Sequence, residues 1–536
     1  MNQRLFFWSL TAALAGFLFG FDTVVISGAE KTVQGLWGLS NGMHGLTISM
    51  ALWGTVVGSL IGGWPSDRFG RKRTLIGIGW LYFVSAVWSG MATDEWSFMI
   101  ARFIGGVGVG ISTIASPLYI AEISPPERRG RLAGMFQFNI VFGILIAFLS
   151  NYMIGQLITD NAWRWMLGIE AIPALIYTVM CFGIPRSPRW LIARHGDRES
   201  AMHVLRQINE SASEEELCGL ADEIEKASKH EAPGHAGSGF WSNQLRIPIL
   251  LAFLVAFFNQ LSGINAILYF APRIFQLAGL GENAALLNSV GIGVTNLLFT
   301  FVGLYLIDRL GRRTLLYIGS FGYIASLGLC AWTFFSFAPQ FQVANTAISL
   351  QNSVDSLEKA SALEVINEQD INKITVQREK AIKAFVAATS TETYEGEAAK
   401  LDKNASSEQI QAVTNAALSE AAKSSGAGGT IVLLCIFAFI AAHAVGQGAV
   451  IWVLISEIFP NRYRAAGQAL GCFTHWIFAA SLTMVFPWMI STFAPGFVFG
   501  FFCFMMVLQL IWVATMVPET KGVPLEEMQT KLGVKP

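Results

Sequence analysis

Two opposite charges stand in apolar stretches of this sequence, Asp22 in "GFLFGFDTVVISG" and Arg102 in "IARFIGG". An isolated ionised side chain at the centre of a lipid bilayer costs about 3 kcal/mol on insertion scales. Pairing offsets much of that cost, so we expect Asp22 and Arg102 to be partners. A carboxylate that pairs with arginine in one state and is desolvated in another can take up a proton on one side of a membrane and release it on the other. A purely structural ion pair is the alternative.

The composition places these charges in a membrane protein. Of 536 residues, 53% are hydrophobic and 14% are charged, which is too apolar for a water-soluble chain of this length. The net charge of −1 and the lack of a basic tail argue against nucleic-acid binding. The six cysteines show no metal-ligand spacing, so we expect no metal and no cofactor.

Twelve segments are apolar and long enough to cross a bilayer, which takes about 20 residues. They lie near residues 5–28, 44–64, 74–92, 98–120, 132–155, 165–184, 247–272, 285–307, 314–337, 430–455, 466–490 and 496–517. The first is longer than a signal-peptide core and lacks a cleavage signal, so we expect it to span the membrane. The sequence therefore predicts an all-α membrane protein.

Basic residues cluster in alternate loops, as in "SDRFGRKR" (66–73), "PPERRGR" (125–131) and "DRLGRR" (308–313). By the positive-inside rule, these loops and both termini are predicted to be cytoplasmic. The expected location is a plasma membrane, the inner membrane in a bacterium, with the lipid bilayer as a partner.

Short motifs recur in the two halves of the sequence. "DRFGRKR" follows the second apolar segment and "DRLGRR" the eighth, while "YIAEISP" (119–125) ends the fourth and "LISEIFP" (454–460) ends the tenth. Such repeats are typical of transporters whose site lies between two halves at the membrane midplane and is exposed to each side in turn. The predicted units are a six-helix bundle over 1–185, a cytoplasmic helical linker over 186–245, a second bundle over 246–517 and a short cytoplasmic tail over 518–536.

Residues 340–428 interrupt the second half, and the topology predicts that they lie outside the cell. This insert is rich in Ala, Ser, Gln, Glu and Lys, with Gly396 and Gly426 as breaks. It is predicted to form one or two polar amphipathic helices. Either it is a solvated cap without a role in transport, or it has a docking or gating role.

Seven motifs together carry a resemblance to a known family. They are "DRFGRKR", "RFIGGVGVG", "PLYIAEISPPERRGR", "QLSGINAILYF", "DRLGRR", "ISEIFPNRYRAAG" and "PETKG". This set resembles the sugar porters of the major facilitator superfamily, which include bacterial proton-coupled xylose symporters and human facilitative glucose transporters. The motifs follow the family order through all twelve segments, and only the 340–428 insert is unmatched. The resemblance implies the major facilitator fold, with two six-helix bundles.

The resemblance implies a role for the embedded charge pair. In the proton-coupled members the residues that match Asp22 and Arg102 form the proton site, whereas facilitative members carry asparagine in place of the aspartate. We therefore expect a proton-coupled monosaccharide importer rather than an enzyme, with sugar and protons as partners. An uncoupled facilitator is the nearest alternative, and a transporter-like sugar sensor is another.

The resemblance also gives candidate sugar-binding residues. Amides and an indole suit a sugar, which offers donors, acceptors and an apolar ring face. The candidates are Gln137, Asn259, Gln260, Asn265, Asn296, His443, Gln447, Trp452 and Trp476. Asn259 stands where the family usually has glutamine. Interhelical hydrogen bonding is the alternative role for each amide.

The tenth segment departs from the family pattern. In "AAHAVGQGAVIW", Ala444 replaces the usual acidic residue and the prolines are missing, which predicts a stiffer helix. His443 resembles a histidine of fructose-transporting relatives, whereas Trp452 is of the glucose and xylose type. His475, beside Trp476, is a weaker candidate. The expected sugar is a hexose, glucose before fructose, with xylose or inositol as alternatives.

A cytoplasmic salt-bridge network is a further implication of the resemblance. Its members here are Asp67, Arg68, Arg71, Glu122, Arg129, Arg131, Glu170, Arg189, Asp308, Arg309, Arg312, Glu457 and Arg464. Exposed ion pairs contribute about 0–1 kcal/mol each, so their use lies in pairing that differs between states. We expect them to latch the outward-facing form of a monomeric transporter.

Overall fold

The computed structural model describes residues 3–125, 128–158, 160–209, 212–230, 239–362, 368–390, 401–402, 405–523 and 525–533. Within these ranges the chain forms helices and no strand. Twelve of the described helices or helix pairs are long and apolar enough to span a membrane. They coincide with the twelve predicted segments, which confirms the all-α membrane class.

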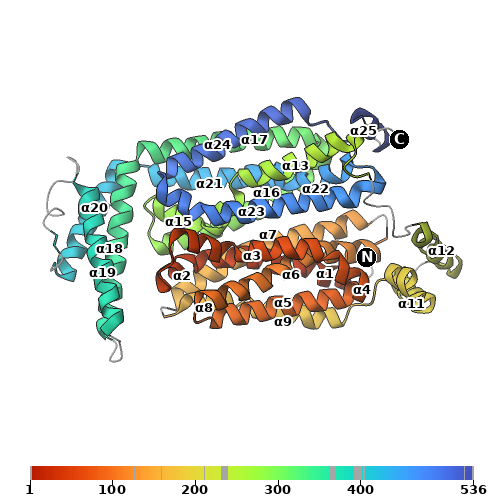
Figure 1. The fold of residues 1–536 in the computed structure, drawn as a ribbon, viewed down its shortest axis with the longest axis horizontal. Helices are drawn as coiled ribbons and strands as arrows, with labels where there is room; N and C mark the ends of the chain where they lie inside the picture. The colour runs from red at the N-terminus through yellow and green to blue at the C-terminus, as the bar shows by residue number, and fades with distance from the viewer. Residues whose placement is uncertain are drawn as a thin grey trace.

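The spanning helices fall into two bundles of six. The first half contains α1 (Gln3–Val25) with η1 (Ile26–Gly28), α3 (Asn41–Ile61), α5 (Arg71–Met91), α6 (Glu95–Ile123), α7 (Arg129–Leu157), and the pair α8 (Ala162–Gly168) and α9 (Ala171–Phe182). The second half contains the pair α13 (Arg246–Leu261) and α14 (Ile264–Tyr269), α16 (Glu282–Leu310), α17 (Arg312–Ser336), the pair α21 (Gly428–Val445) and α22 (Gln447–Ile458), α23 (Arg464–Thr492) and α24 (Pro495–Met516). Figure 1 shows the two halves side by side, the first in red and orange and the second in green and blue.

The halves meet along two pairs of helices. α3 packs against α23, and α7 packs against α16. Gly45 of α3 permits one close approach, because a Cβ atom at this position would lie 1.8 Å from the carbonyl oxygen of Met484 on α23. Gly45 thus lets two helices from different halves touch through their backbones.

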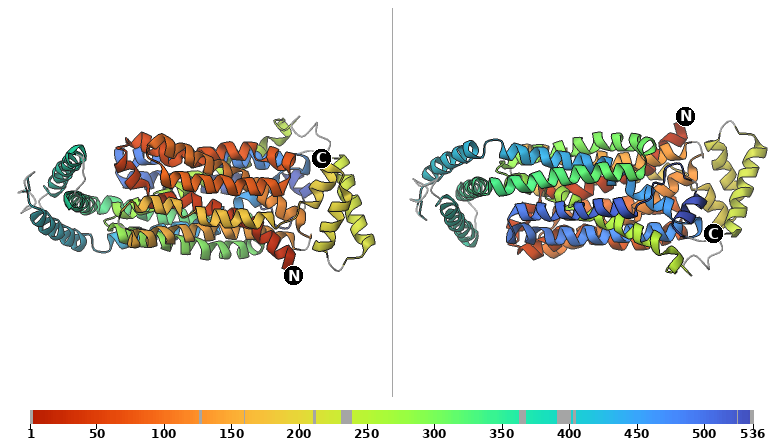
Figure 2. Two further views of the ribbon diagram at one scale, coloured as in Figure 1. Left: turned by 90° about the horizontal axis from the view of Figure 1, so that it is seen from below. Right: turned by 90° about the horizontal axis from the view of Figure 1, so that it is seen from above.

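The two ends of the bundle carry different additions. Beyond one end lie α18 (Ala338–Ala362), α19 (Glu368–Thr389) and α20 (Ser407–Ser425), here named the cap, and we name this end the cap end. At the opposite end, named the linker end, lie α10 (Pro188–Trp190), η2 (Leu191–His195), α11 (Arg198–Ile208) and α12 (Glu214–His230), and Figure 2 shows both chain termini there. Shorter helices complete the fold: α2 (Glu30–Leu36) and α15 (Ala271–Leu277) at the cap end, and α4 (Gly63–Phe69), η3 (Asn243–Leu245), η5 (Asn461–Tyr463) and α25 (Leu525–Lys531) at the linker end.

The cap differs from its prediction, because the described part contains three helices where one or two were expected. Apolar residues spaced along all three helices, among them Leu350, Phe385 and Ile410, pack into a hydrophobic cluster of their own. Three helices can enclose such a cluster, whereas one or two polar helices leave it exposed to water. Gly426, with a φ of 53°, ends α20 as predicted, and Gly396 lies outside the described residues.

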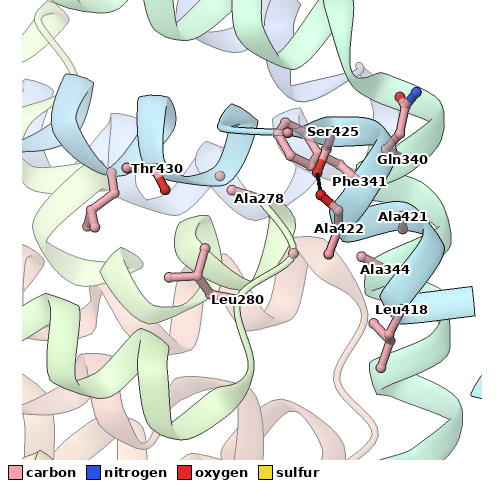
Figure 3. Close-up of a pocket in the computed structure, with 14 residues that line it drawn as sticks. Ala278, Leu280, Gln340, Phe341, Ala344, Leu418, Ala421, Ala422, Ser425 and Thr430 are labelled. Atoms are coloured by element: carbon pink, nitrogen blue, oxygen red, sulfur yellow. Dashed lines mark hydrogen bonds between the residues drawn. The ribbon is translucent and has the colours of Figure 1, made fainter. Parts of the chain in front are cut away.

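The cap joins the second half through a small contact. A cavity of 240 Å³ lies between the cap residues Ala344 and Ser425 and the second-half residues Leu280 and Thr430 (Figure 3). The cap therefore has its own core and meets the bundle beside this cavity, where α18 contacts α15 and α17.

Several spanning helices are broken within the bundle. α13 and α14 are separated by Ser262 and Gly263, and Gly263 has a φ of 87°, which favours glycine. α21 and α22 are separated by Gly446, where a Cβ atom would lie 2.7 Å from the Cα atom of Gly319. The prediction of a stiffer tenth segment is therefore wrong, because close packing of two glycines breaks this helix without proline.

Candidate functional site

Asp22 and Arg102 are in contact inside the first half. Asp22 lies in the last turn of α1, Arg102 lies near the start of α6, and each is 1% exposed. The Arg102 guanidinium donates from Nη1 to the Asp22 carboxylate at 2.5 Å and from Nη2 to the Asp22 backbone carbonyl at 2.9 Å. Each charge thus compensates the other within the apolar bundle.

Glu170 lies beside this pair, and its predicted place in the cytoplasmic network is wrong. It stands at the break between α8 and α9, inside a spanning segment, and is 1% exposed. Its carboxyl group lies within electrostatic range of Asp22 and Arg102. The charge site of the first half therefore contains two carboxyl groups and one guanidinium. An acidic residue in an apolar segment was the signal, the same one that singled out Asp22.

Two tyrosines that the sequence analysis missed enclose the charges. Tyr82 of α5 lies within electrostatic range of Asp22 and Glu170. Tyr269 of α14, from the second half, lies within range of Asp22 and Arg102. Both tyrosines are 1% exposed. The second half therefore contributes to the surroundings of a charge site in the first.

Most of the predicted sugar-binding residues gather around the break between α13 and α14. Gln260 donates to the Asn259 side chain at 2.8 Å and accepts from Asn265 at 2.6 Å. Both ring nitrogens of His475, on α23, lie 3.1 Å from the Gln260 amide nitrogen. His475 was a weaker candidate in the sequence, and the structure places it at the centre of this cluster.

Two indoles flank His475. Its ring lies 5.3 Å from that of Trp452 on α22 and 4.7 Å from that of Trp476. Buried Trp476 also contacts Phe19 of α1, with ring centroids 5.6 Å apart. Phe19 lies one helical turn before Asp22, so the amide and indole cluster of the second half is one side chain away from the charge site of the first.

The remaining sugar-binding candidates lie apart from this cluster. The Nδ1 atom of His443 lies in hydrogen-bond contact with the Tyr323 hydroxyl at 2.7 Å. Gln447, beside the Gly446 break, is buried, and its amide atoms have no partner among the described residues. Asn296 on α16 is nearly buried and Gln137 on α7 is half-buried, and no hydrogen bond in the described part of the chain joins either to Gln260.

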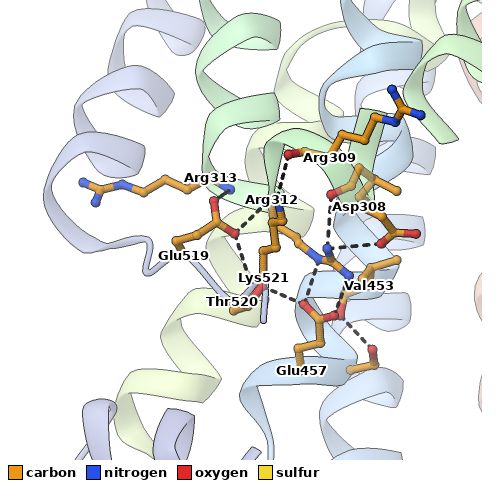
Figure 4. Close-up of polar contacts among 11 residues, drawn as sticks. Asp308, Arg309, Arg312, Arg313, Val453, Glu457, Glu519, Thr520 and Lys521 are labelled. Atoms are coloured by element: carbon orange, nitrogen blue, oxygen red, sulfur yellow. Dashed lines mark hydrogen bonds and ion pairs between the residues drawn. The ribbon is translucent and has the colours of Figure 1, made fainter. Parts of the chain in front are cut away.

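At the linker end, the predicted network forms the same cluster twice. In the first half Arg71 pairs with Glu122 at 2.9 Å and Asp67 at 3.1 Å. In the second half Arg312 pairs with Glu457 at 2.8 Å and Asp308 at 3.4 Å (Figure 4).

A glycine with positive φ precedes the arginine in each of these clusters. The φ is 84° at Gly70 and 91° at Gly311, so each glycine turns the chain into the next spanning helix.

The "PETKG" motif completes the second-half cluster. Glu519 accepts hydrogen bonds from the backbone nitrogens of Arg312 and Arg313 at 2.9 and 3.1 Å, at the start of α17. A carboxylate at this position stabilises the N-terminus of a helix. The Thr520 hydroxyl donates to Glu457 at 2.6 Å. In the sequence this motif indicates only the family resemblance, and its place in the cluster becomes visible in the structure.

Other predicted members of the network take no part in these ion pairs. Arg68 lies over the Trp64 ring and Arg309 over the Tyr305 ring, and Figure 4 shows Arg309 directed away from Glu457. Arg131 and Arg189 are exposed, and the side chain of Arg129 lies outside what the structure describes. Arg464 lines a cavity of 340 Å³ together with Glu457. In the described part of the network, each ion pair lies within one half.

Comparison with known proteins identifies the family. The chain matches the family model described as "Sugar (and other) transporter" over residues 8–349 and 410–532. The chain belongs to this sugar transporter family. It is therefore a membrane transporter of sugars and not an enzyme. The stretch that the family model leaves unmatched lies in the cap.

Individual members of the sugar transporter family match along nearly the whole chain. An arabinose-proton symporter of Bacillus subtilis is 31% identical over 98% of this chain and 94% of its own length. A D-xylose-proton symporter of Escherichia coli is 28% identical over 98% of this chain and 96% of its own. The inward open conformation of the xylose transporter XylE from E. coli matches with a TM-score of 0.70 and 28% identity, covering 98% of this chain and 99% of that one.

Proposed function

We propose that this sugar transporter couples the import of a monosaccharide to protons by alternating access. The observation that carries the proposal is the buried contact of Asp22 with Arg102, which has the buried carboxyl group of Glu170 within electrostatic range. Buried charges are costly in a membrane and by default indicate a functional site. An intramembrane carboxyl group that is paired with arginine is suited to proton relay. Two similar proteins are described as proton symporters, of arabinose and of xylose, which supports the same coupling here.

The coupling step follows from the two arrangements open to Asp22. While Arg102 donates to the carboxylate, Asp22 is stable as an anion. If movement of α1 separates the pair, the carboxylate loses its counter-charge and binds a proton instead. The contact of Phe19 with Trp476 links α1 to the proposed sugar site, so sugar occupancy and the position of α1 influence each other.

We assign the linker end to the cytoplasm and the cap end to the outside. The clusters around Arg71 and Arg312 lie at the linker end, and basic residues favour the cytoplasmic side. The chain is similar to an inward open structure, and Gly45 and Met484 bring the halves together at the cap end. Both observations support a conformation that is closed to the outside.

The proposed sugar site is the cluster of Gln260, Asn265, His475, Trp452 and Trp476. Its amides supply donors and acceptors for hydroxyl groups, and its indoles supply flat apolar faces for a sugar ring. Glucose is the predicted sugar, and Trp452 favours it over fructose. Pentoses are the second candidate, because the named relatives are symporters of arabinose and xylose.

The test uses purified protein in lipid vesicles with an imposed pH gradient and radiolabelled glucose, xylose and arabinose. The wild type should accumulate its sugar when the outside is acidic. Asp22→Asn should still exchange sugar across the membrane but should not accumulate it, because a permanently neutral side chain cannot carry the proton. Asp160→Asn, which neutralises an exposed aspartate, is the matched control and should behave as the wild type. Accumulation against a gradient by Asp22→Asn would refute proton coupling, and wild-type uptake that ignores the pH gradient would favour an uncoupled facilitator.

A further inference from the structure

A buried ion pair joins the two halves at the cap end, away from the sites described above. Glu30, the first residue of α2, is 1% exposed and belongs to the first half. Arg273 on α15 belongs to the second half and donates to both Glu30 oxygens, from Nε at 2.8 Å and from Nη2 at 2.7 Å. This two-point contact is the strong geometry for an arginine and a carboxylate.

Neighbouring polar groups extend the contact on both sides. His44 of α3 lies 2.8 Å from Glu30, and Gln34 accepts from Arg273 at 2.6 Å. Lys31 donates to Gln276 of α15 at 2.8 Å, which is a second bond between the halves. The His44 ring also lies edge-on to Phe270, with centroids 6.1 Å apart. The cluster therefore holds α15 to α2 and α3 through several side chains.

The charge on Glu30 depends on its partners. Burial raises the pKa of this carboxyl, but the Arg273 charge and the His44 hydrogen bond outweigh burial and lower the pKa to about 2. Glu30 thus remains ionised at any physiological pH, and this contribution to stability is lost progressively as the pH falls from the ordinary carboxyl pKa of 4.5 to the folded pKa of about 2. A buried carboxylate that loses Arg273 has to reach water, so separation of the two residues requires the halves to part.

The ion pair is placed to control a helix of the proposed sugar site. α15 follows α14 with only Phe270 between them, and α14 carries both Asn265 and Tyr269. α14 and α15 both pack against η1 of the first half. Holding α15 in place therefore also holds Asn265 beside Gln260 and Tyr269 beside the charge site.

We propose that Glu30 and Arg273 form an external gate lock, a contact that closes the outer side of the cavity and breaks each time the transporter opens outward. The two are positioning residues, because they act on sugar through α14 and not by contact. The proposal rests on the proposed function for its sidedness. The ion pairs around Arg71 and Arg312 lie within one half each, so they can persist when the halves move. The Glu30–Arg273 pair joins the two halves, so it stabilises only the state in which the outer side is closed.

The test measures access to the outer side directly. A cysteine replaces Ser27, a buried η1 residue whose hydroxyl has no partner among the described residues, in a background where exposed Cys218 is changed to serine. A membrane-impermeant maleimide is applied to the outside of intact cells. Glu30→Gln and Arg273→Gln should each label about tenfold faster than the parent, since truncating one partner of a buried charge pair is costly. The double exchange Glu30→Arg with Arg273→Glu should restore slow labelling.

Transport kinetics give a second readout that a merely structural role would not produce. Each single variant should show a lower KM for external sugar together with a lower maximal rate, because the outward-open state becomes more populated and return to the closed state slows. Asp160→Asn, which neutralises an exposed carboxyl outside this cluster, is the matched control and should label and transport as the parent.

Unchanged labelling of either single variant, in protein with a normal size-exclusion profile, would overturn the lock. If the glutamine variants cannot be purified, Arg273→Lys keeps the charge but loses the two-point contact, so labelling at the parent rate would count against the proposal. Labelling requires neither sugar nor a proton gradient. Failure of proton coupling in Asp22→Asn and failure of the lock are therefore separate results.

Discussion

At the scale of single residues, two buried polar side chains find their partners on another helix. The Asp22 carboxylate binds Arg102 of α6, and the Asn151 amide of α7 donates to the backbone carbonyl of Val25 at 2.9 Å. An unpaired polar group in an apolar bundle is costly, so the sequence predicts that such a group has a polar partner. The identity of the partner is harder to predict, because it can lie far away in the sequence: Arg102 is 80 positions from Asp22.

The amide cluster gives the prediction at this scale. Gln260→Ala and Asn265→Ala should each weaken sugar binding by about tenfold to a hundredfold, because a sugar hydroxyl would lose its partner in a buried site. Binding is measured by isothermal titration with the purified protein. Asn288→Ala is the matched control, since Asn288 is half-buried and its amide bonds its own helix at the Ala284 carbonyl. Wild-type affinity in both cluster variants would show that the sugar binds elsewhere.

At the scale of elements, breaks in spanning helices place the polar groups. Asn265 and Gln260 flank the break at Gly263, Glu170 stands at the break between α8 and α9, and Gln447 follows the break at Gly446. A break frees backbone groups and turns side chains inward, and it is tolerated in a membrane only where protein or water surrounds it. The apolar run of residues predicts the span, whereas packing of one glycine against another decides where the span is broken.

The cap gives the prediction at the scale of elements. Replacing residues 345–423 with a short glycine and serine linker should leave sugar uptake unchanged within about twofold, because the cap has its own hydrophobic cluster. The linker is feasible because Ala344 and Ser425 line the same small cavity (Figure 3). Uptake is compared at equal amounts of protein in the membrane. A severe loss in a correctly folded variant would instead give the cap a role in gating.

At the scale of the whole molecule, the two halves share a repeated arginine cluster, whereas the additions at the two ends of the molecule occur once each. In both the Arg71 and the Arg312 cluster, the arginine pairs with the aspartate four positions before it and with a glutamate from another helix. The cap and the helices α10 to α12 occur once each and lie at opposite ends (Figure 2). The repeated part is suited to rocking of one half on the other, and the unrepeated parts mark the two sides of the membrane.

The sidedness of the molecule is open to a direct test. Cys218 on α12 is exposed, while the other cysteines are buried or half-buried. If the linker end is cytoplasmic, an impermeant maleimide should label Cys218 only after the cells are permeabilised. Ala412→Cys adds an exposed position on the cap and should be labelled in intact cells. Labelling of Cys218 in intact cells would reverse the proposed orientation.

The sequence by itself determined the properties that depend on local composition and on the cost of burial. Twelve apolar segments specify twelve spans, because the bilayer sets a minimum hydrophobic length. A lone aspartate and a lone arginine in such segments specify an ion pair, because neither is stable alone. Repeated motifs specify two similar arginine clusters, which form around Arg71 and Arg312.

Only the tertiary structure decided which distant groups meet. It moved Glu170 from the predicted network to Asp22, placed His475 against Gln260, and brought Arg273 to Glu30 across 243 positions of the chain. Contacts between helices depend on how the halves pack and on which conformation the transporter occupies, and residue types along the chain carry no information about either.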